Sequence, residues 1–214
     1  MNPYERNAID FLAKIDYLTK RKDLKTKDSL FKVLDHIQLR EGFHLGLKVA
    51  GKVGMGDESS FYCYYGKEDP ILSGLPLSSH DHILDAILFA GLDVEPSEMG
   101  AWQAYLLWMS PTVLPVFWHG GYIVREYFFD RENFKGISII PTYGAMPVNV
   151  TLDKIPQPTV TMEENKAVVS CPYWNEWEGL VLESMPVIFK GDGEIAFRKA
   201  RHKVLYKYNC GICF

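Results

Sequence analysis

A segment from Met99 to Val124 constrains the fold more than any other feature, because it carries no charged side chain when His119 is counted as neutral. Glu98 and Arg125 bound the segment, and it holds three of the five tryptophans. A segment of this length without charges has to be shielded from water by a membrane, a protein core or a ligand. The choice among these settings decides which class of protein the chain belongs to.

The segment cannot cross a membrane as one helix. A spanning helix needs about 20 consecutive apolar residues. Pro111 and Pro115 fall in the middle of the segment, and each removes a helical hydrogen-bond donor and clashes with the preceding turn. The helical part can run only from about Ser97 to Ser110, roughly 21 Å. We therefore predict no membrane span, but a buried helix, a proline-rich turn and a buried strand, 113–118.

The composition is that of a soluble globular protein. The chain of 214 residues can bury one good core, or at most two small ones, and its hydrophobic share of 47% is ordinary. The net charge of −4 argues against a general affinity for nucleic acid. The N-terminus lacks the pattern of a signal peptide, and four cysteines are too few for a disulfide scaffold, so we expect a cytoplasmic protein.

Hydrophobic periodicity predicts helices in the first part of the chain. A first helix is indicated by an apolar stripe at spacings of three and four, formed by Ala8, Phe11, Leu12, Ile15 and Leu18. A second helix is expected over about 26–39. Alternating residues then predict a strand at 43–50, paired with 60–65 in a hairpin. A third helix is expected to begin at Ser78-Ser79, with a capping-box spacing, and to end at Gly91.

The C-terminal half is expected to consist mostly of strands. The predicted strands are 113–118, 122–129, 136–140, 148–152, 159–162, 167–173 and 180–189. A last helix is predicted over 194–208, because Phe197, Ala200, Val204 and Tyr208 recur at helical spacing, although Ile195, Phe197 and the late tyrosines also suit a strand. The chain therefore reads as a single α+β domain, 1–214, with a helical segment, 1–41, packed on two central helices and a mostly antiparallel sheet.

A first candidate site is His80-Asp81-His82 together with Asp85. Imidazole and carboxylate groups suit a divalent metal such as zinc or iron, and His119 is a further candidate ligand. The segment also coincides with the expected start of a helix. Residues two apart on a helix point in different directions, so the two histidines would diverge there. We favour a solvated helix start over a metal site.

A second candidate is Trp118-His119-Gly120-Gly121. A histidine at the end of a buried strand, beside two glycines that allow close approach, could form the wall of a pocket. Two glycines between two strands are also a common hairpin turn, and we favour that interpretation.

The C-terminal Cys210-Gly-Ile-Cys213 is a third candidate, since Cys-x-x-Cys is half of a zinc site or a redox pair. Cys63, Cys171 or His202 would have to supply the other half through the fold. We favour a tail that docks by its apolar residues.

Basic residues crowd the last predicted element. They are Arg198, Lys199, Arg201, Lys203 and Lys207, with Tyr206 and Tyr208 among them. Basic and aromatic residues together can bind single-stranded nucleic acid, although such a run more often forms one solvated face. We favour the solvated face.

An aromatic segment, 171–178, contains Tyr173, Trp174 and Trp177 near the carboxylates of Glu176 and Glu178. Such a segment can hold a sugar or a cationic ligand, or form a surface for a protein partner. We favour the partner surface.

Two functional hypotheses follow. The first is a non-catalytic binding or interaction module, regulatory or toxin-neutralising, which needs no cofactor and binds a protein partner or a small ligand. Its expected interaction residues are Trp118, His119, Tyr173, Trp174, Glu176 and Trp177. The second is a metal-dependent hydrolase, whose expected divalent-metal ligands are His80, His82, Asp85 and His119.

Overall fold

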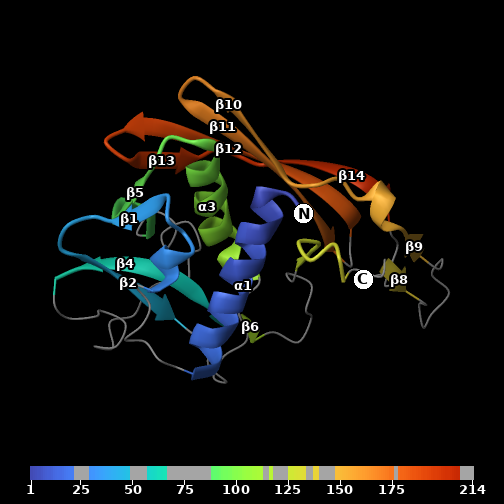
Figure 1. Cartoon of the computed structure of the whole chain (residues 1–214), viewed down its shortest axis with the longest axis horizontal. Helices are drawn as coiled ribbons and strands as arrows, with labels where there is room; N and C mark the ends of the chain where they lie inside the picture. Colours follow the sequence, from blue (N-terminus) through green and yellow to red (C-terminus); the bar gives the residue numbers. More distant parts are fainter. Residues whose placement is uncertain are drawn as a thin grey trace.

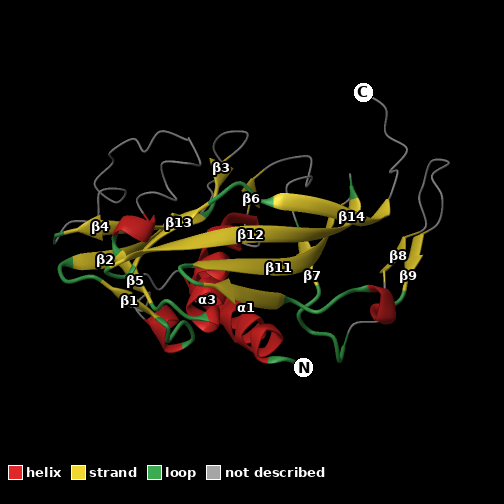
Figure 2. Ribbon diagram, turned by 90° about the horizontal axis from the view of Figure 1, so that it is seen from above, coloured by secondary structure: helices red, strands yellow, loops and turns green. Residues whose placement is uncertain are grey.

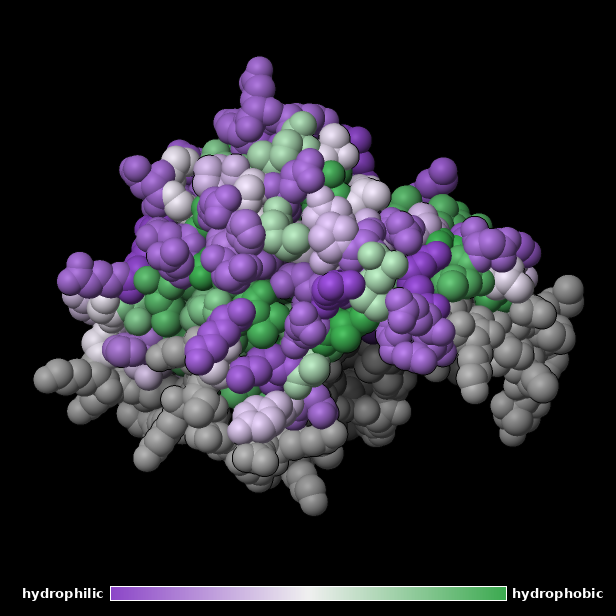
Figure 3. Space-filling model, in the orientation of Figure 1, coloured by the Kyte–Doolittle hydropathy of each residue, from purple (hydrophilic) through white to green (hydrophobic). Residues whose placement is uncertain are grey.

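The computed structural model describes residues 1–21, 29–48, 57–66, 88–112, 116–117, 125–133, 137–139, 148–175 and 178–207. In Figure 1 the largest sheet lies above two helices, α1 (Pro3–Arg21) and α3 (Glu98–Met109), with small pairs of strands around them. Figure 3 shows mostly hydrophilic residues on the described part of this face, with hydrophobic patches between them.

The largest sheet has six antiparallel strands. They are β7 (Glu126–Tyr127), β10 (Thr159–Glu163), β11 (Lys166–Asn175), β12 (Gly179–Gly191), β13 (Glu194–Phe197) and β14 (Arg201–Lys207). β11 pairs with one edge of β12, and β10 and β7 pair with β11. β13 and β14 pair with the other edge of β12, end to end, as Figure 2 shows.

Alternation along β11 and β12 gives the sheet an inner face that packs against α3. Val169, Met185 and Val187 point to this face and are buried, as a side-chain period of two requires. Glu183 points to it as well and lies opposite Cys171 in the register of the two strands. The inner face therefore carries one carboxylate within an apolar core.

The caps of the two helices follow from the sequence. Asn2 and Glu5 cap α1 reciprocally, since the Asn2 side chain accepts from Glu5 N at 2.8 Å and Glu5 Oε2 accepts from Asn2 N at 2.9 Å. Ser97 caps α3 by accepting from Gly100 N at 3.0 Å. Nine of the twelve residues of α3 are buried, which confirms the buried helix expected from the uncharged segment.

No described helix combines the length and the apolar composition that crossing a membrane would take.

The remaining elements are short. Four two-stranded antiparallel sheets are formed by β1 (Ile37–Leu39) with β5 (Leu92–Val94), β2 (Phe43–Lys48) with β4 (Ser60–Tyr65), β3 (Asp57–Glu58) with β6 (Val116–Phe117), and β8 (Ile137–Ile139) with β9 (Val148–Val150). Short 3-10 turns include η2 (Ser110–Thr112) and η3 (Leu152–Lys154). The β2–β4 hairpin and the overall α+β class agree with the sequence analysis.

Two predicted helices are wrong. In the described part of 26–39, residues 29–32 form a 3-10 turn and 37–39 form β1, which pairs with β5. In 194–208, β13 and β14 replace the helix, because the long edge of β12 offers backbone hydrogen bonds that a helix at this place would leave unpaired. Of the helix expected from residue 78, only 88–90 lie in the described part, and they are helical.

Candidate functional site

Most of the predicted site residues lie outside the described residues. They are His80, His82, Asp85, Trp118, His119, Glu176, Trp177, Cys210 and Cys213. The metal site and the Cys-x-x-Cys pair therefore stay predictions. Within the described ranges, no three His, Cys, Asp or Glu side chains are grouped so that they could hold a metal ion.

Tyr173 and Trp174 are described, and both are buried, with 1% and 3% of their surface exposed. They are neighbours on β11, so their side chains lie on opposite faces of the sheet. Trp174 packs in a small core with Phe128, Ile155 and Leu180. This burial corrects the expectation of an exposed aromatic surface at these two positions, because the density of rings in a sequence does not distinguish a core from a surface.

Tyr173 belongs instead to a charged cluster around the buried carboxylate of Glu183. Arg125 Nη1 donates to Glu183 Oε1 at 3.0 Å and to Oε2 at 2.9 Å. The Tyr105 hydroxyl donates to Oε1 at 2.9 Å, and His202 Nε2 lies 2.8 Å from Oε2. The carboxylate therefore joins α3, β12, β14 and the residue that precedes β7.

Burial shifts the ionisation of the groups around this carboxylate. The Arg125 guanidinium lies 4.4 Å from the centre of the Tyr173 ring. Burial acts to lower the pKa of Arg125, but the oxygens of Tyr127, Glu183 and Tyr173 outweigh it, so the pKa is raised. Burial also raises the pKa of Tyr173 to about 12 and that of the Cys171 thiol well above its usual range.

The cluster is arranged for structure rather than for contact with a substrate. Both oxygens of Glu183 are occupied by hydrogen bonds, and the residue is fully buried. A general base must reach the proton it removes, and among the described residues both oxygens of Glu183 already accept hydrogen bonds. We conclude that Glu183 fixes the position of its partners.

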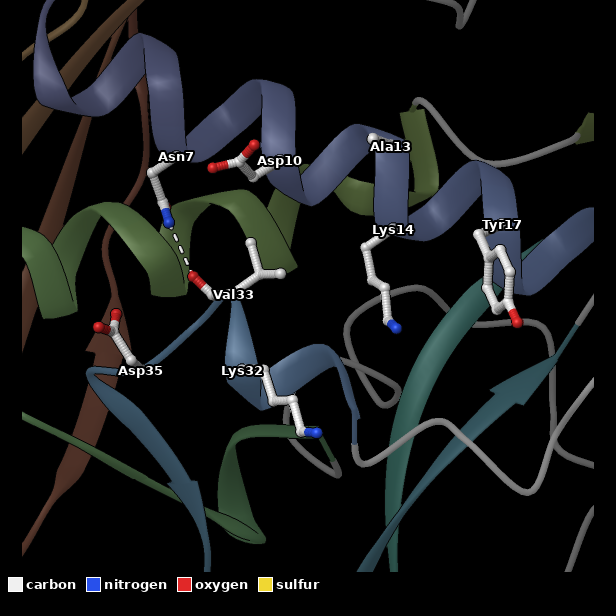
Figure 4. Close-up of a pocket in the computed structure, with 8 residues that line it drawn as sticks. All are labelled: Asn7, Asp10, Ala13, Lys14, Tyr17, Lys32, Val33 and Asp35. Atoms are coloured by element: carbon white, nitrogen blue, oxygen red, sulfur yellow. Dashed lines mark hydrogen bonds between the residues drawn. The ribbon is translucent and has the colours of Figure 1, made fainter.

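One cavity, of about 580 Å³, lies between α1 and residues 32–35. Figure 4 shows Lys14 and Lys32 at this cavity beside Asp10 and Asp35, and the amide of Asn7 donating to the Val33 carbonyl at 2.8 Å. The two lysines and the two acids balance each other. The charged residues that line the cavity therefore carry no net charge to favour an anion or a cation.

A second cavity, of about 670 Å³, has a different character, and we call it the aromatic groove. It lies where the β12–β13 hairpin meets the end of α3 and residues 89–90. Its apolar lining includes Phe89, Trp108, Met185, Ile195 and Phe197, and its charged lining is Lys190, Glu194, Arg198 and Lys199.

The rings of the aromatic groove pack on one another. Phe197 stacks on Trp108 with 5.8 Å between the ring centres, and Phe89 meets it edge-on at 5.0 Å. The row of rings continues along α3, from Trp108 to Tyr105 at 5.9 Å and from Tyr105 to Trp102 at 5.7 Å. The floor of the groove is thus the end of a ring stack that begins in the core.

The rim of the groove is positively charged. Lys190, Arg198 and Lys199 are exposed, and none of them forms an ion pair within the described ranges. Glu194 lies 3.6 Å from Arg40 and is therefore partly neutralised. A local excess of positive charge on a chain of net charge −4 favours anionic ligands at this place.

Two cations of the groove are prominent in the sequence, but the groove itself was not predicted from it. The helix predicted over 194–208 placed Arg198 and Lys199 on the face of a helix. The signal that could have found the groove is the turn Asp192-Gly193, followed by alternating apolar residues at Ile195 and Phe197, which is the pattern of a hairpin.

No family model matches the chain, and comparisons with curated proteins and with solved structures find no match either.

Proposed function

We propose that the chain is a non-catalytic binding protein, of a regulatory or toxin-neutralising type, that holds an acidic segment of a protein partner at the aromatic groove. The observation that carries the proposal is the combination of an aromatic floor with a rim whose three cations form no ion pair among the described residues. The floor suits an aromatic or aliphatic side chain, and the rim suits carboxylates on either side of it.

The expected strength of such binding is weak. Burying one large apolar side chain contributes about 2 kcal/mol. Each exposed ion pair adds only about 0.2–1 kcal/mol and weakens as salt screens it. With three cations on the rim these contributions sum to at most about 5 kcal/mol before the cost of ordering a short peptide, so we expect a dissociation constant on the order of 0.2–1 mM.

The test uses synthetic fluorescein-labelled peptides of Glu, Ser and Gly with one central Phe, measured by fluorescence anisotropy. Two matched peptides replace Phe by Ser or every Glu by Gln. We expect saturable binding of the peptide that has both Glu and Phe, and none of the two matched peptides. Its affinity should fall roughly tenfold between about 50 mM and 300 mM salt. Equal binding of the Gln peptide, or no binding of any peptide up to about 1 mM, would overturn the proposal.

Matched variants locate the binding. The double variant Arg198→Glu with Lys199→Glu reverses two charges of the rim and should weaken the acidic peptide at least tenfold. The control is Lys32→Glu, an exposed lysine of the other cavity, which should leave the affinity within about twofold. An equal loss in both proteins would show non-specific attraction and contradict the proposed site.

A further inference from the structure

We propose that the free edge of β14 accepts an extended acidic segment of a protein partner as an additional strand. The inference rests on the binding role proposed above and adds the way in which the segment is held. An extended segment that joins a sheet edge gains affinity from its main chain and specificity from alternate side chains.

β14 has the geometry of an open edge. It pairs with β12 from Arg201 opposite Ser184 to Lys207 opposite Gly179, with a register shift at Leu205, and β12 is its one neighbour among the described strands. Figures 1 and 2 place it at the margin of the sheet. Every residue of the strand except Leu205 is exposed. Alternate backbone groups along such a strand point outward without a partner strand.

The side chains of β14 fit an acidic and partly apolar segment. Val204 and Tyr206, with exposed fractions of 48% and 36%, are among the few exposed large hydrophobic residues of the described part. Arg201, Lys203 and Lys207 are exposed and form no ion pair with any described residue. Charge complementarity therefore favours carboxylates on a partner segment that pairs with β14.

The edge of β14 continues into the aromatic groove. β13 and β14 follow one another along the same edge of β12, and residues 198–200 join them. Arg198 N still donates to Pro186 O at 2.9 Å, so the connection stays beside the sheet. A segment paired with β14 would run toward Arg198 and Lys199, where the groove begins.

The opposite edge of the sheet does not offer the same chemistry. β10 has one neighbour, β11, among the described strands, but its exposed residues are Thr159, Thr161 and Glu163. The one carboxylate of β10, Glu163, is paired with Lys166 of β11, and β10 itself carries no cation for an acidic segment. β14 is therefore the edge that suits it.

Two other occupants are less suited to β14. A second copy paired edge to edge would set cations against cations, and lysines on an edge strand oppose such pairing. Single-stranded nucleic acid would meet the cations, but β14 carries one exposed aromatic ring, at Tyr206, where stacking needs several. Both occupants are outcomes of the test.

The test places N-methyl groups on the acidic Phe peptide, at odd positions in one version and at even positions in the other. Because alternate amides of a paired strand face its neighbour, one version should lose at least about 30-fold in affinity and the other should stay within about threefold. If both versions bind like the parent, the strand pairing is wrong and binding at the groove stands. If the parent does not bind, the proposed function itself fails.

Variants and competing ligands complete the test. Lys203→Glu on β14 should weaken the parent peptide about tenfold, while the matched Thr161→Glu on β10 should leave it within about twofold. Equal effects of the two variants would overturn the assignment to β14. Tighter binding of a dodecameric oligouridine than of the parent peptide would show that β14 binds single-stranded nucleic acid instead. A dimer in analytical ultracentrifugation that Lys203→Glu dissociates would show that a second copy of the chain occupies the edge.

Discussion

At the scale of residues, Glu183 shows how a single charge can be kept inside a core. Its carboxylate is buried on the inner face of the sheet, and it is kept there by Arg125, Tyr105 and His202. Removing one partner from such a group leaves the other charge buried and unpaired, which costs more than the pair contributes.

Glu183→Gln should therefore be strongly destabilising. The change keeps an acceptor for Tyr105 but leaves the buried guanidinium of Arg125 without its counter-charge, and we expect a loss of about 3–5 kcal/mol in the free energy of unfolding. The measurement is urea denaturation followed by circular dichroism. The control is Glu163→Gln, which removes the exposed ion pair with Lys166 and should cost at most about 1 kcal/mol. Equal losses in both variants would contradict the structural role of Glu183.

The two buried cysteines should be inert in the folded protein. Burial raises the pKa of Cys63 to about 12, and Cys171 is shifted in the same direction. Since the thiolate is the reactive form, alkylation by iodoacetamide near neutral pH should be at least about 100-fold slower than in urea, as measured for each cysteine by mass spectrometry. Rapid labelling of either cysteine without denaturant would show that its site opens.

At the scale of elements, α3 was predictable because its signals are local. The uncharged run, Ser97 as a cap and Pro111 beyond its end all lie within the helix or next to it. β13 has a local signal in the turn Asp192-Gly193 and the alternating Ile195 and Phe197, but the strands within 26–39 and 201–207 were not predictable from local signals. Their fate depends on β5 and on the edge of β12, which are far away in the sequence, and pairing with these strands outweighs a helical spacing of apolar residues.

Gly100→Ala in the first turn of α3 separates local propensity from packing. Alanine is the better helix former by about 1 kcal/mol, so propensity alone predicts stabilisation. In the structure, however, a Cβ at this position would lie 2.1 Å from the Glu95 carbonyl oxygen. We expect destabilisation by about 1–3 kcal/mol in urea denaturation.

The control for Gly100→Ala is Gly191→Ala, where a Cβ would meet nothing within 4 Å and only the positive φ of +97° opposes the change. That variant should lose about 1–2 kcal/mol from backbone strain. A stabilised Gly100→Ala protein would show that the backbone before α3 moves freely.

At the scale of the whole molecule, alkali should destabilise the folded protein through its tyrosines. Tyr4 and Tyr173 have pKa values raised from 10.0 to about 12, first by burial and, for Tyr4, also by its hydrogen bond to Glu98. The folded state holds these protons more tightly than the unfolded state. The resulting stability is therefore fully present below pH 10 and is lost as the pH rises through about 12.

The measurement is the urea midpoint as a function of pH, with tyrosinate absorbance recorded in parallel. Tyr4→Phe removes one of the titrating groups and should make the midpoint fall less steeply between pH 10 and 12. An unchanged slope would rule out this contribution of Tyr4.

The aromatic groove could not be predicted from the sequence because its parts are scattered. Phe89, Trp108 and Met185 come from three separate parts of the chain and meet only when β13 closes against α3. The cations of the rim were visible as a cluster in the sequence, but their setting on a sheet edge follows from pairing with β12. Local sequence patterns show that aromatic and basic residues are present. Strand pairing between segments far apart in the sequence decides which of them come together at the groove.

The stack of rings along α3 also gives the molecule an optical property. Neighbouring rings from Trp102 through Tyr105 to Trp108 lie less than 6 Å apart, so their near-ultraviolet transitions couple. Trp102 is fully buried in the core, whereas Trp108 is half-buried and packs against Phe197. The emission of Trp108 should therefore change colour and intensity when the water beside it is displaced. Intrinsic tryptophan fluorescence should therefore report ligand binding at the groove without a label.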